Sequence, residues 1–387
     1  MKINMKILYL LHSSGISEGS SIAAISIIKE MQKKGHQIYA ACPKQGPLVD
    51  TLKNLGVQVS VIYYASAIYP SVYTFKSFIS WPKRLFSLLW KNHLAEISLE
   101  KLVKDIQPDI IHTNVGVLRV GFDVARKLKV PHVWHIRETD KGIKSHHFPS
   151  KVFQKAVLKT NDINIAITEA VQCYYMLSPQ NTRIVYDGVF SKDYKSQKIT
   201  KKSKYFLFVG RVSKSKGADW AVESFLRIAK QFPDKELWLA GGDNNQFANM
   251  LKTKVSNSPY NKRVKFLGTR SDIYELMSHA QAVLVPSVME GFGFITVEAM
   301  VNKTIVIGRN TGGTKEQFDN GLKMTGHEIA LRCEDINGMT QHMLNVCRNG
   351  QNYYSDMISS AYMVVRNLYT IEHNAEQIET IYKEIKK

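Results

Sequence analysis

The sequence is poor in cysteine and in the motifs that bind metals. Four cysteines occur among 387 residues, and no two of them form a C-x-x-C pair. This scarcity offers no disulfide framework and favours a reducing, cytoplasmic setting. D-x-D and H-E-x-x-H motifs are absent too, so we expect neither a bound metal nor another cofactor.

Long apolar runs are also missing. No stretch approaches the roughly 18 uncharged apolar residues of a membrane span, and the N-terminal apolar run of about six residues is too short for a signal-peptide core. Hydrophobic residues make up 44% of the chain, and its length suits two cores better than one. We therefore expect a globular protein of two domains.

Acidic residues are the scarcer charged type. The chain has 33 Asp and Glu against 52 Lys and Arg, a formal net charge of +19. Such an excess attracts anionic partners, which include nucleic acid, an acidic membrane surface and phosphorylated substrates. Net charge alone does not choose among them.

The first half of the chain alternates short apolar runs with amphipathic segments. This alternation is typical of a parallel sheet covered by helices on both faces. We predict strands at residues 6–11, 36–42, 57–63, 109–113, 132–136, 162–167 and 183–186, and helices at 20–34 (capped by Ser20 or Ser21), 48–55 and 121–128.

The second half repeats this style after a polar, lysine-rich stretch at 191–204, the best linker candidate. The sequence thus predicts an α/β protein with two Rossmann-like, doubly wound domains, 1–190 and 191–370, facing across a cleft. A helix over 371–387 could pack back on either domain, the N-terminal one being favoured. The predicted strands of this half are 205–209, 236–240, 264–267, 282–285 and 304–307.

Two glutamates bracket a glycine-rich turn in the second half. Glu290 and Glu298 flank Gly291 and Gly293, between the predicted strand 282–285 and a helical pattern that follows it. The glycines let the backbone approach a ligand, and a helix N-terminus attracts an anion such as phosphate. Glu298 would lie about one turn inside the helix. Phosphate at the helix tip and carboxylates for hydroxyl groups together suggest a sugar nucleotide.

A basic loop follows the predicted strand 205–209. It contains Gly210, Arg211, Lys216 and Gly217, and it does not match the P-loop pattern. Arg211 offers a bidentate fork and Lys216 a mobile point charge, both suited to a pyrophosphate. The alternative is a solvated basic loop without a ligand.

Candidate residues also occur in the first half. The loop with Gly15 and Gly19 follows the first strand and could hold a phosphate or acceptor, or be a plain tight turn. His112, His132 and His135 stand at predicted strand ends, and such histidines can bind hydroxyls, transfer protons or be purely structural. Clustering favours His135 and Arg137 facing a site, whereas Glu138 and Asp140 form a lone E-x-D that is not expected to bind metal.

Residues 63–91 combine many aromatic side chains with lysine and arginine, and no acidic residue occurs until Glu96. This composition is typical of a segment that lies at the surface of an anionic membrane. Two alternatives remain, namely stacking on single-stranded nucleic acid and a core helix with snorkelling lysines.

The motifs of the second half occur in a characteristic order: the basic loop 210–217, Leu-Ala-Gly-Gly at 239–242, Val-Lys-Phe-Leu-Gly at 264–268, the turn 290–298 and Asn-Thr-Gly-Gly-Thr at 310–314. In this order they resemble glycosyltransferase family 4, whose members are retaining, nucleotide-sugar-dependent enzymes of GT-B fold. The resemblance covers nearly the whole chain. Residues 133–138 and 185–189 look like bacterial members that build surface polysaccharides.

Carried over to this chain, the resemblance implies a donor site. Arg211 and Lys216 would hold the pyrophosphate, Glu298 the ribose hydroxyls and Glu290 a hydroxyl of the donor sugar. Arg211 and Lys216, with the helix N-terminus, would thereby serve catalysis by stabilising charge on the departing diphosphate, and Glu290 would serve it through its bond to the donor sugar. The other implied donor-binding residues are Gly210, Gly268, Arg270, Gly291, Phe292, Gly293, Ile295 and Thr296.

The resemblance also implies that the first domain binds the acceptor, a glycan or a lipid-linked glycan, with His135 beside the reacting carbon as a catalytic residue. Asn114 is a departure, since many relatives have a second histidine at that position. The implied acceptor-binding residues are Gly15, Gly19, His112, Asn114 and Arg137.

These features predict a retaining hexosyltransferase in surface-polysaccharide biosynthesis. It would use a UDP- or GDP-sugar, need no metal and work at the inner face of the plasma membrane, touching anionic lipid through residues 63–91. The alternatives are a sugar-nucleotide epimerase of GT-B fold and a basic nucleic-acid-binding protein, although no nucleic-acid partner is expected.

Overall fold

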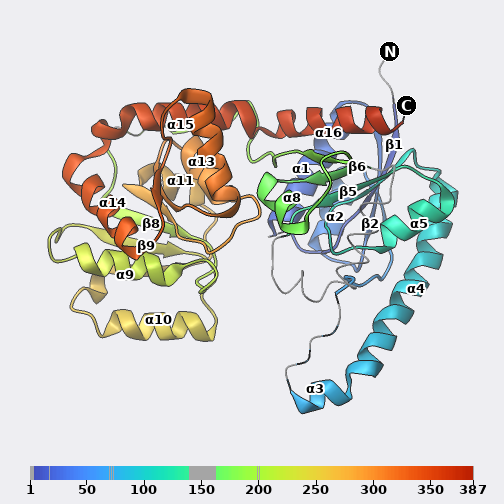
Figure 1. The fold of residues 1–387 in the computed structure, drawn as a ribbon, viewed down its shortest axis with the longest axis horizontal. Helices are drawn as coiled ribbons and strands as arrows, with labels where there is room; N and C mark the ends of the chain where they lie inside the picture. Colours follow the sequence, from blue (N-terminus) through green and yellow to red (C-terminus); the bar gives the residue numbers. More distant parts are fainter. Residues whose placement is uncertain are drawn as a thin grey trace. The chain divides into compact units, whose positions relative to one another are not determined.

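A computed structural model describes residues 4–16, 18–68, 70, 72, 74–138, 163–197, 199 and 201–386 (Figure 1). The chain forms two compact units: unit 1 comprises Met1–Gly188 with Ile371–Lys387, and unit 2 comprises Val189–Thr370. The sequence placed the linker at 191–204, yet that stretch belongs to unit 2. Lys202 there donates to the Ser278 carbonyl oxygen at 2.6 Å, so its side chain is held by unit 2.

Unit 1 is built on a parallel sheet. Its described strands follow the order β3-β2-β1-β4-β5-β6-β7, so the order reverses between β1 and β4. β4 and β5 are buried along their whole length, which explains why neither contains an acidic residue, a lysine or an arginine. The strands are β1 Lys6–Leu10, β2 Gln37–Cys42, β3 Gln58–Val61, β4 Ile110–Thr113, β5 His132–Ile136, β6 Ile163–Ala166 and β7 Thr182–Ile184.

The helices of unit 1 include one from the far end of the chain. α16 packs on α1, and the Lys34 ammonium lies 3.0 Å from the Glu379 carboxylate there. The described helices of this unit are α1 Gly19–Lys33, α2 Pro47–Asn54, α3 Phe75–Ile79, α4 Trp81–Ile106, α5 Val120–Leu128, α8 Glu169–Tyr175 and α16 Ile371–Ile385.

Two local predictions in unit 1 were wrong. Ser20 and Ser21 do not cap α1, because the extended backbone that a cap requires is found at Glu18 and both serines lie inside the helix. His132 begins β5, so it does not belong with the histidines that cluster at the carboxyl ends of adjacent strands. Its ring hydrogen-bonds to Thr113 Oγ1 at 2.8 Å and packs edge-on against neighbouring aromatic rings, which is a structural role away from the carboxyl ends of the strands.

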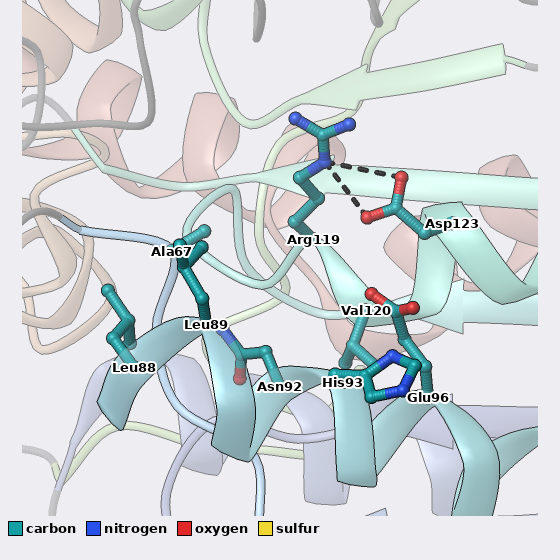
Figure 2. A pocket seen from close by; sticks show the side chains of 9 residues that line it. All are labelled: Ala67, Leu88, Leu89, Asn92, His93, Glu96, Arg119, Val120 and Asp123. Atoms are coloured by element: carbon teal, nitrogen blue, oxygen red, sulfur yellow. Dashed lines mark hydrogen bonds and ion pairs between the residues drawn. The ribbon is translucent and has the colours of Figure 1, made fainter. Parts of the chain in front are cut away.

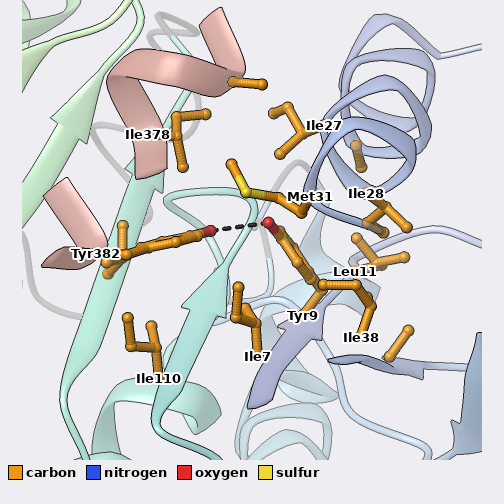
Figure 3. Close-up of a cluster of buried hydrophobic side chains, with 14 of the residues drawn as sticks. Ile7, Tyr9, Leu11, Ile27, Ile28, Met31, Ile38, Ile110, Ile378 and Tyr382 are labelled. Atoms are coloured by element: carbon orange, nitrogen blue, oxygen red, sulfur yellow. Dashed lines mark hydrogen bonds between the residues drawn. The ribbon is translucent and has the colours of Figure 1, made fainter. Parts of the chain in front are cut away.

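A mainly aliphatic core joins β1, α1 and α16 (Figure 3). Tyr9 of β1 and Tyr382 of α16 are fully buried there, and their hydroxyl oxygens lie 2.8 Å apart. A buried hydroxyl needs a hydrogen-bond partner, so this pair fixes the C-terminal helix on the sheet.

Unit 2 repeats the doubly wound pattern. Its described strands follow the order β10-β9-β8-β11-β12-β13, and the order reverses between β8 and β11. The strands are β8 Tyr205–Val209, β9 Glu236–Ala240, β10 Val264–Gly268, β11 Ala282–Val285, β12 Ile305–Arg309 and β13 Leu331–Cys333. Only β13, which has three residues, was absent from the prediction.

Helices cover both faces of this sheet, as expected for strands that are buried on both sides. The described helices are α9 Ala218–Ile228, α10 Gln246–Ser256, η1 Asn261–Arg263, α11 Ile273–His279, α12 Phe294–Val301, α13 Gly312–Thr325, α14 Ile336–Asn349, η2 Gln351–Tyr354 and α15 Ser355–Leu368.

Candidate functional site

The loops that leave β8 and β11 meet where the strand order of unit 2 reverses. Ligands of open α/β sheets bind at this point, outside the carboxyl ends of the strands. Lys216 follows β8 and Glu290 follows β11, and the Lys216 ammonium lies 2.6 Å from Glu290 Oε1. The Val288 amide donates to the Ser215 carbonyl oxygen at 2.9 Å, which fixes the two loops to each other.

Gly217 explains how these loops approach so closely. Its φ is +70°, and a Cβ built on it would lie 2.2 Å from the Pro286 carbonyl oxygen. Any other residue would therefore suffer both backbone strain and a clash with main-chain atoms. The glycine keeps Lys216 over the end of β11.

The N-terminus of α12 faces this site without a side-chain cap. Gly293 is the N-cap, with φ +95°, and the first turn carries no acidic residue. Uncapped amides and the helix dipole make such an end a site for an anion. Within the first turn, the buried Thr296 hydroxyl has no hydrogen-bond partner among the described residues, as expected of a group that meets a ligand.

Glu298 is the only carboxyl residue of α12, and its pKa is strongly shifted. Burial raises its pKa to about 7, while a hydrogen bond with the Tyr274 hydroxyl of α11 opposes the shift. Burial also raises the pKa of Tyr274, so the phenol stays protonated and donates to the carboxylate. The second carboxylate oxygen of Glu298 can accept from a ligand hydroxyl.

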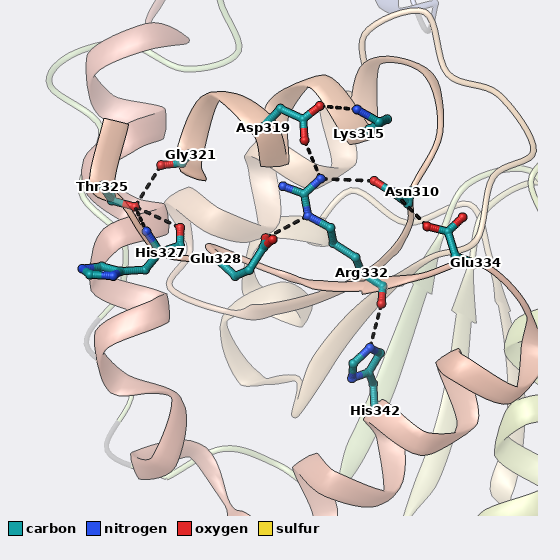
Figure 4. A network of polar contacts seen from close by, with 10 residues as sticks. All are labelled: Asn310, Lys315, Asp319, Gly321, Thr325, His327, Glu328, Arg332, Glu334 and His342. Carbon is teal, nitrogen blue, oxygen red and sulfur yellow. Dashed lines mark hydrogen bonds and ion pairs between the residues drawn. The ribbon is translucent and has the colours of Figure 1, made fainter. Parts of the chain in front are cut away.

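The turn at 310–314 supports the glycine-rich turn from behind. The Gly313 amide donates to the Glu290 carbonyl oxygen at 2.9 Å, and a Cβ on Gly313 would lie 2.4 Å from the Phe292 carbonyl oxygen. Asn310 at its start accepts from the Arg332 guanidinium at 3.2 Å, within a network of charged residues (Figure 4). This network anchors the beginning of α13 and, through it, the Glu290 backbone.

The remaining predicted donor residues lie at the same edge of the sheet. Gly210 follows β8 with φ +140°, and Arg211 after it is exposed. Gly268 ends β10 with φ +64°, and its carbonyl oxygen accepts from Gly241 at 2.8 Å. Arg270 forms a two-point ion pair with Asp272, two residues further on.

In unit 1, the predicted acceptor residues at the ends of β4 and β5 form one buried cluster. His112 Nε2 lies 3.2 Å from His135 Nδ1, and the Arg137 guanidinium lies 3.3 Å from the same Nδ1. Arg137 also donates to Asn114 Oδ1 at 3.2 Å and pairs with the buried carboxylate of Asp187. Asp187 lies within the stretch 185–189 that carries part of the resemblance, but its pairing with Arg137, 50 residues earlier, was not predicted.

The loop after β1 is tied to the same edge. Gly15 donates to Ser13 Oγ at 3.1 Å, and Gly19 begins α1. Asn114 donates to the Ser20 carbonyl oxygen at 3.0 Å, so the loops after β1 and β4 are joined at the strand reversal of unit 1.

Glu138 accepts hydrogen bonds from the amides of Gly116 and Arg137, at 3.0 and 3.1 Å. Asp140, the second member of the E-x-D pattern, lies outside the described residues. Among the residues that the structure describes, no group of three or more His, Cys, Asp and Glu side chains is placed to hold a metal ion.

A pocket of about 260 Å³ opens beside α4 in unit 1 (Figure 2). Leucines from α4 line one side, and the Arg119–Asp123 ion pair and Glu96 line another. Burial, and secondarily Asp123, raises the pKa of Glu96. The pocket was not predictable from the sequence, because its lining comes from α4, the start of α5 and Ala67.

The aromatic segment is largely exposed, so the core-helix alternative for residues 63–91 was wrong. Phe75 is 79% exposed, Phe86 68% and Trp90 53%, and the rings of Phe86 and Trp90 stack. α4 is buried only towards its C-terminal end. None of the described helices combines the length and the apolar character needed to cross a bilayer.

Comparison with known proteins identifies both halves of the chain. Residues 18–190 match the family model Glycosyltransferase Family 4, and residues 189–362 match Glycosyl transferases group 1. The N-acetyl-alpha-D-glucosaminyl L-malate synthase of Bacillus anthracis is 20% identical over 95% of this chain and 94% of its own. The lipopolysaccharide core biosynthesis mannosyltransferase LpsB of Rhizobium meliloti is 24% identical over 46% of this chain and 50% of its own.

Solved structures show the same architecture. HepE of Anabaena, in complex with UDP, has a TM-score of 0.78 at 18% identity and covers 98% of this chain and 100% of its own. A glycosyltransferase from Rickettsia africae has a TM-score of 0.78 at 17% identity, covering 99% and 98%. The chain therefore belongs to the glycosyltransferases that join a family 4 domain to a group 1 domain, and it has their GT-B fold.

Proposed function

We propose that this glycosyltransferase moves a sugar, with retention of its anomeric configuration, from a UDP- or GDP-sugar to a glycan or lipid-linked acceptor in surface-polysaccharide biosynthesis. The observation that carries the proposal is the meeting of Lys216, Glu290 and the uncapped N-terminus of α12 at the strand reversal of unit 2. A cation, an anion-binding helix end and a carboxylate suit, respectively, the diphosphate and the sugar of one donor.

The basic loop after β8, the N-terminus of α12 and Glu298, one turn inside that helix, supply the donor-binding contacts. Lys216, Arg211 and the first amides of the helix take the diphosphate, while Glu298 accepts a ribose hydroxyl beside Tyr274. Glu290 exchanges its ion pair with Lys216 for a hydroxyl of the sugar. The HepE structures that hold UDP and UDP-glucose make UDP-sugars the first donors to test.

Two features support a lipid-linked acceptor and a peripheral position on a membrane. Exposed aromatic rings of α3 and α4 stand among basic residues, which suits the anionic cytoplasmic leaflet. The pocket beside α4 adds an apolar wall and a polar wall, as an amphipathic acceptor needs. Relatives named for lipopolysaccharide biosynthesis support the polysaccharide role.

The proposed transfer needs no covalent bond between the sugar and the protein. The bond from the sugar carbon to the diphosphate breaks while the acceptor oxygen bonds to that carbon on the same face, and the acceptor proton passes to the leaving phosphate. Lys216, Arg211 and the helix end stabilise the charge that appears on the diphosphate. No metal is needed in this scheme, because these groups supply the positive charge.

The proposal is tested by incubating the protein with UDP- and GDP-sugars, with and without a bacterial lipid extract. Transfer appears as a glycosylated lipid with equimolar nucleoside diphosphate, and NMR coupling at the anomeric carbon reports the configuration of the product. Altered nucleotide sugar without added acceptor would instead indicate an epimerase. An inverted product would overturn the retaining mechanism.

A further inference from the structure

A chain of buried hydrogen bonds runs from the C-terminal helix to His135. The hydroxyls of Tyr9 and Tyr382 lie 2.8 Å apart, and the Tyr382 hydroxyl lies 2.6 Å from His112 Nδ1. On its other side, His112 Nε2 lies 3.2 Å from His135 Nδ1. The four side chains come from β1, α16, β4 and β5, and all four are fully buried. Figure 3 shows the tyrosine pair at the start of this chain.

The protons of this chain have one arrangement that satisfies every contact. An arginine is always a donor, and the Arg137 guanidinium points at His135 Nδ1 from 3.3 Å. Nδ1 of His135 must therefore be an acceptor, so His112 Nε2 carries the hydrogen that faces it. A neutral His112 then accepts at Nδ1 from Tyr382.

Both histidines are neutral near pH 7. Burial, and after it the charge of Arg137, lowers the pKa of each well below the ordinary value of 6.5. A neutral His135 whose Nδ1 accepts must carry its hydrogen on Nε2. That atom is buried and has no hydrogen-bond partner among the described residues.

We propose that Arg137 directly, and Tyr382 through His112, hold His135 in the tautomer that carries its hydrogen on Nε2, so that His135 presents a neutral hydrogen-bond donor to an oxygen of the substrate. Tyr382 and His112 are thus positioning residues supplied by α16 and β4. A substrate oxygen that reaches Nε2 supplies the partner that this buried donor lacks. The inference rests on the proposed function.

This arrangement decides which role His135 takes. It cannot accept the acceptor proton at Nε2, which is already protonated, and Nδ1 is occupied by two donors. Accepting a proton would also create a buried cation beside Arg137. His135 therefore orients substrate or stabilises developing charge, and the leaving phosphate takes the proton.

The test combines NMR with kinetics on the full chain. Protein labelled with 15N-histidine gives two-bond 15N–1H patterns that distinguish the two neutral tautomers, and variants H135Q and H112Q assign the signals. Tyr382→Phe removes the donor to His112, whereas Tyr9→Phe removes the other hydroxyl of the same buried pair. The two variants lose equivalent packing, so Tyr9→Phe is the matched control.

We expect the Nε2–H tautomer of His135 in the wild type and in Tyr9→Phe. In Tyr382→Phe, His112 loses the donor that holds its Nδ1 as an acceptor and populates its Nδ1–H form in part. The Nε2–H tautomer of His135 is then held by Arg137 alone, and its population falls. Transfer should then fall about tenfold in kcat, with donor KM little changed, as for other losses of an orienting partner. Adding more acceptor should restore neither the His135 tautomer signal nor the kcat of Tyr382→Phe.

An Nδ1–H tautomer of His135 in the wild type would overturn the inference, even if neither tyrosine variant folds. Equal kcat and unchanged tautomers in the two tyrosine variants would also overturn it, since only packing would then be lost. Absence of transfer in the wild type would refute the proposed function but leave the tautomer measurement intact.

Discussion

Replacement of Lys216 by methionine separates donor binding from stability. The Lys216–Glu290 ion pair is partly exposed, with 38% and 18% of the two side chains accessible, so its loss should cost only about 0.2–1 kcal/mol of folding free energy. A charge-assisted hydrogen bond to a diphosphate contributes about 1.5–3 kcal/mol, which corresponds to roughly 10- to 150-fold in affinity. Lys216→Met should therefore weaken diphosphate binding strongly and leave the protein folded.

Calorimetric titration with UDP and GDP, alongside thermal unfolding, measures both quantities. Lys214→Met is the matched control: Lys214 lies on the same loop, is 71% exposed and pairs with Asp219. Glu290→Gln supplies an internal check, because it releases Lys216 and should spare UDP affinity while weakening the UDP-sugar. Equal losses of affinity in Lys216→Met and Lys214→Met would refute the assignment of Lys216 to the diphosphate.

Three further predictions follow from the geometry. The pKa of Glu298 is about 7 in the folded protein and 4.5 ordinarily, so between these pH values the folded protein keeps a proton that the unfolded chain releases, and the free energy of unfolding falls as pH rises. Urea unfolding of Glu298→Gln should lack this fall, and parallel curves of stability against pH for the variant and the wild type would contradict the prediction. Gly217→Ala should cost more than about 2 kcal/mol and abolish donor binding, whereas Gly326→Ala, which meets strain without a clash, should cost about 1 kcal/mol in the same unfolding assay. Trp90→Ser should weaken binding to anionic vesicles roughly tenfold, measured by sedimentation against Tyr353→Ser, an exposed aromatic of unit 2; equal binding would exclude the α4 surface.

Most strands were predictable because they are short apolar runs that end at a turn, whereas β13, with the sequence Leu-Arg-Cys, gives no such signal. β8, β9 and β11 have the predicted bounds, and α12 begins within one residue of the expected position. The glycines of the donor turn were recognisable for the same reason, since their spacing reflects a local backbone requirement. Glu298 lies one turn inside α12 as predicted.

Contacts between distant segments were not predictable from local patterns. The Lys216–Glu290 ion pair, the partner Asp187 and the reach of Tyr382 to His112 depend on how sheets assemble segments far apart in the chain. The predicted N-cap of α1 was wrong. Ser20 and Ser21 both have side chains that suit an N-cap, but the extended backbone of the cap position is found at Glu18. Exposure of the aromatic segment likewise depends on what packs against α4.

The central claim is that unit 2 holds a nucleotide-sugar donor through its diphosphate. Thermal unfolding in the presence of UDP, GDP, the corresponding monophosphates and a short oligonucleotide tests it directly, because a ligand that binds only the folded state raises the melting temperature. We expect saturable stabilisation by one nucleoside diphosphate and much weaker stabilisation by its monophosphate. In Lys216→Met, neither nucleotide should raise the melting temperature. Stabilisation by the oligonucleotide alone, without a response to either diphosphate, would contradict it.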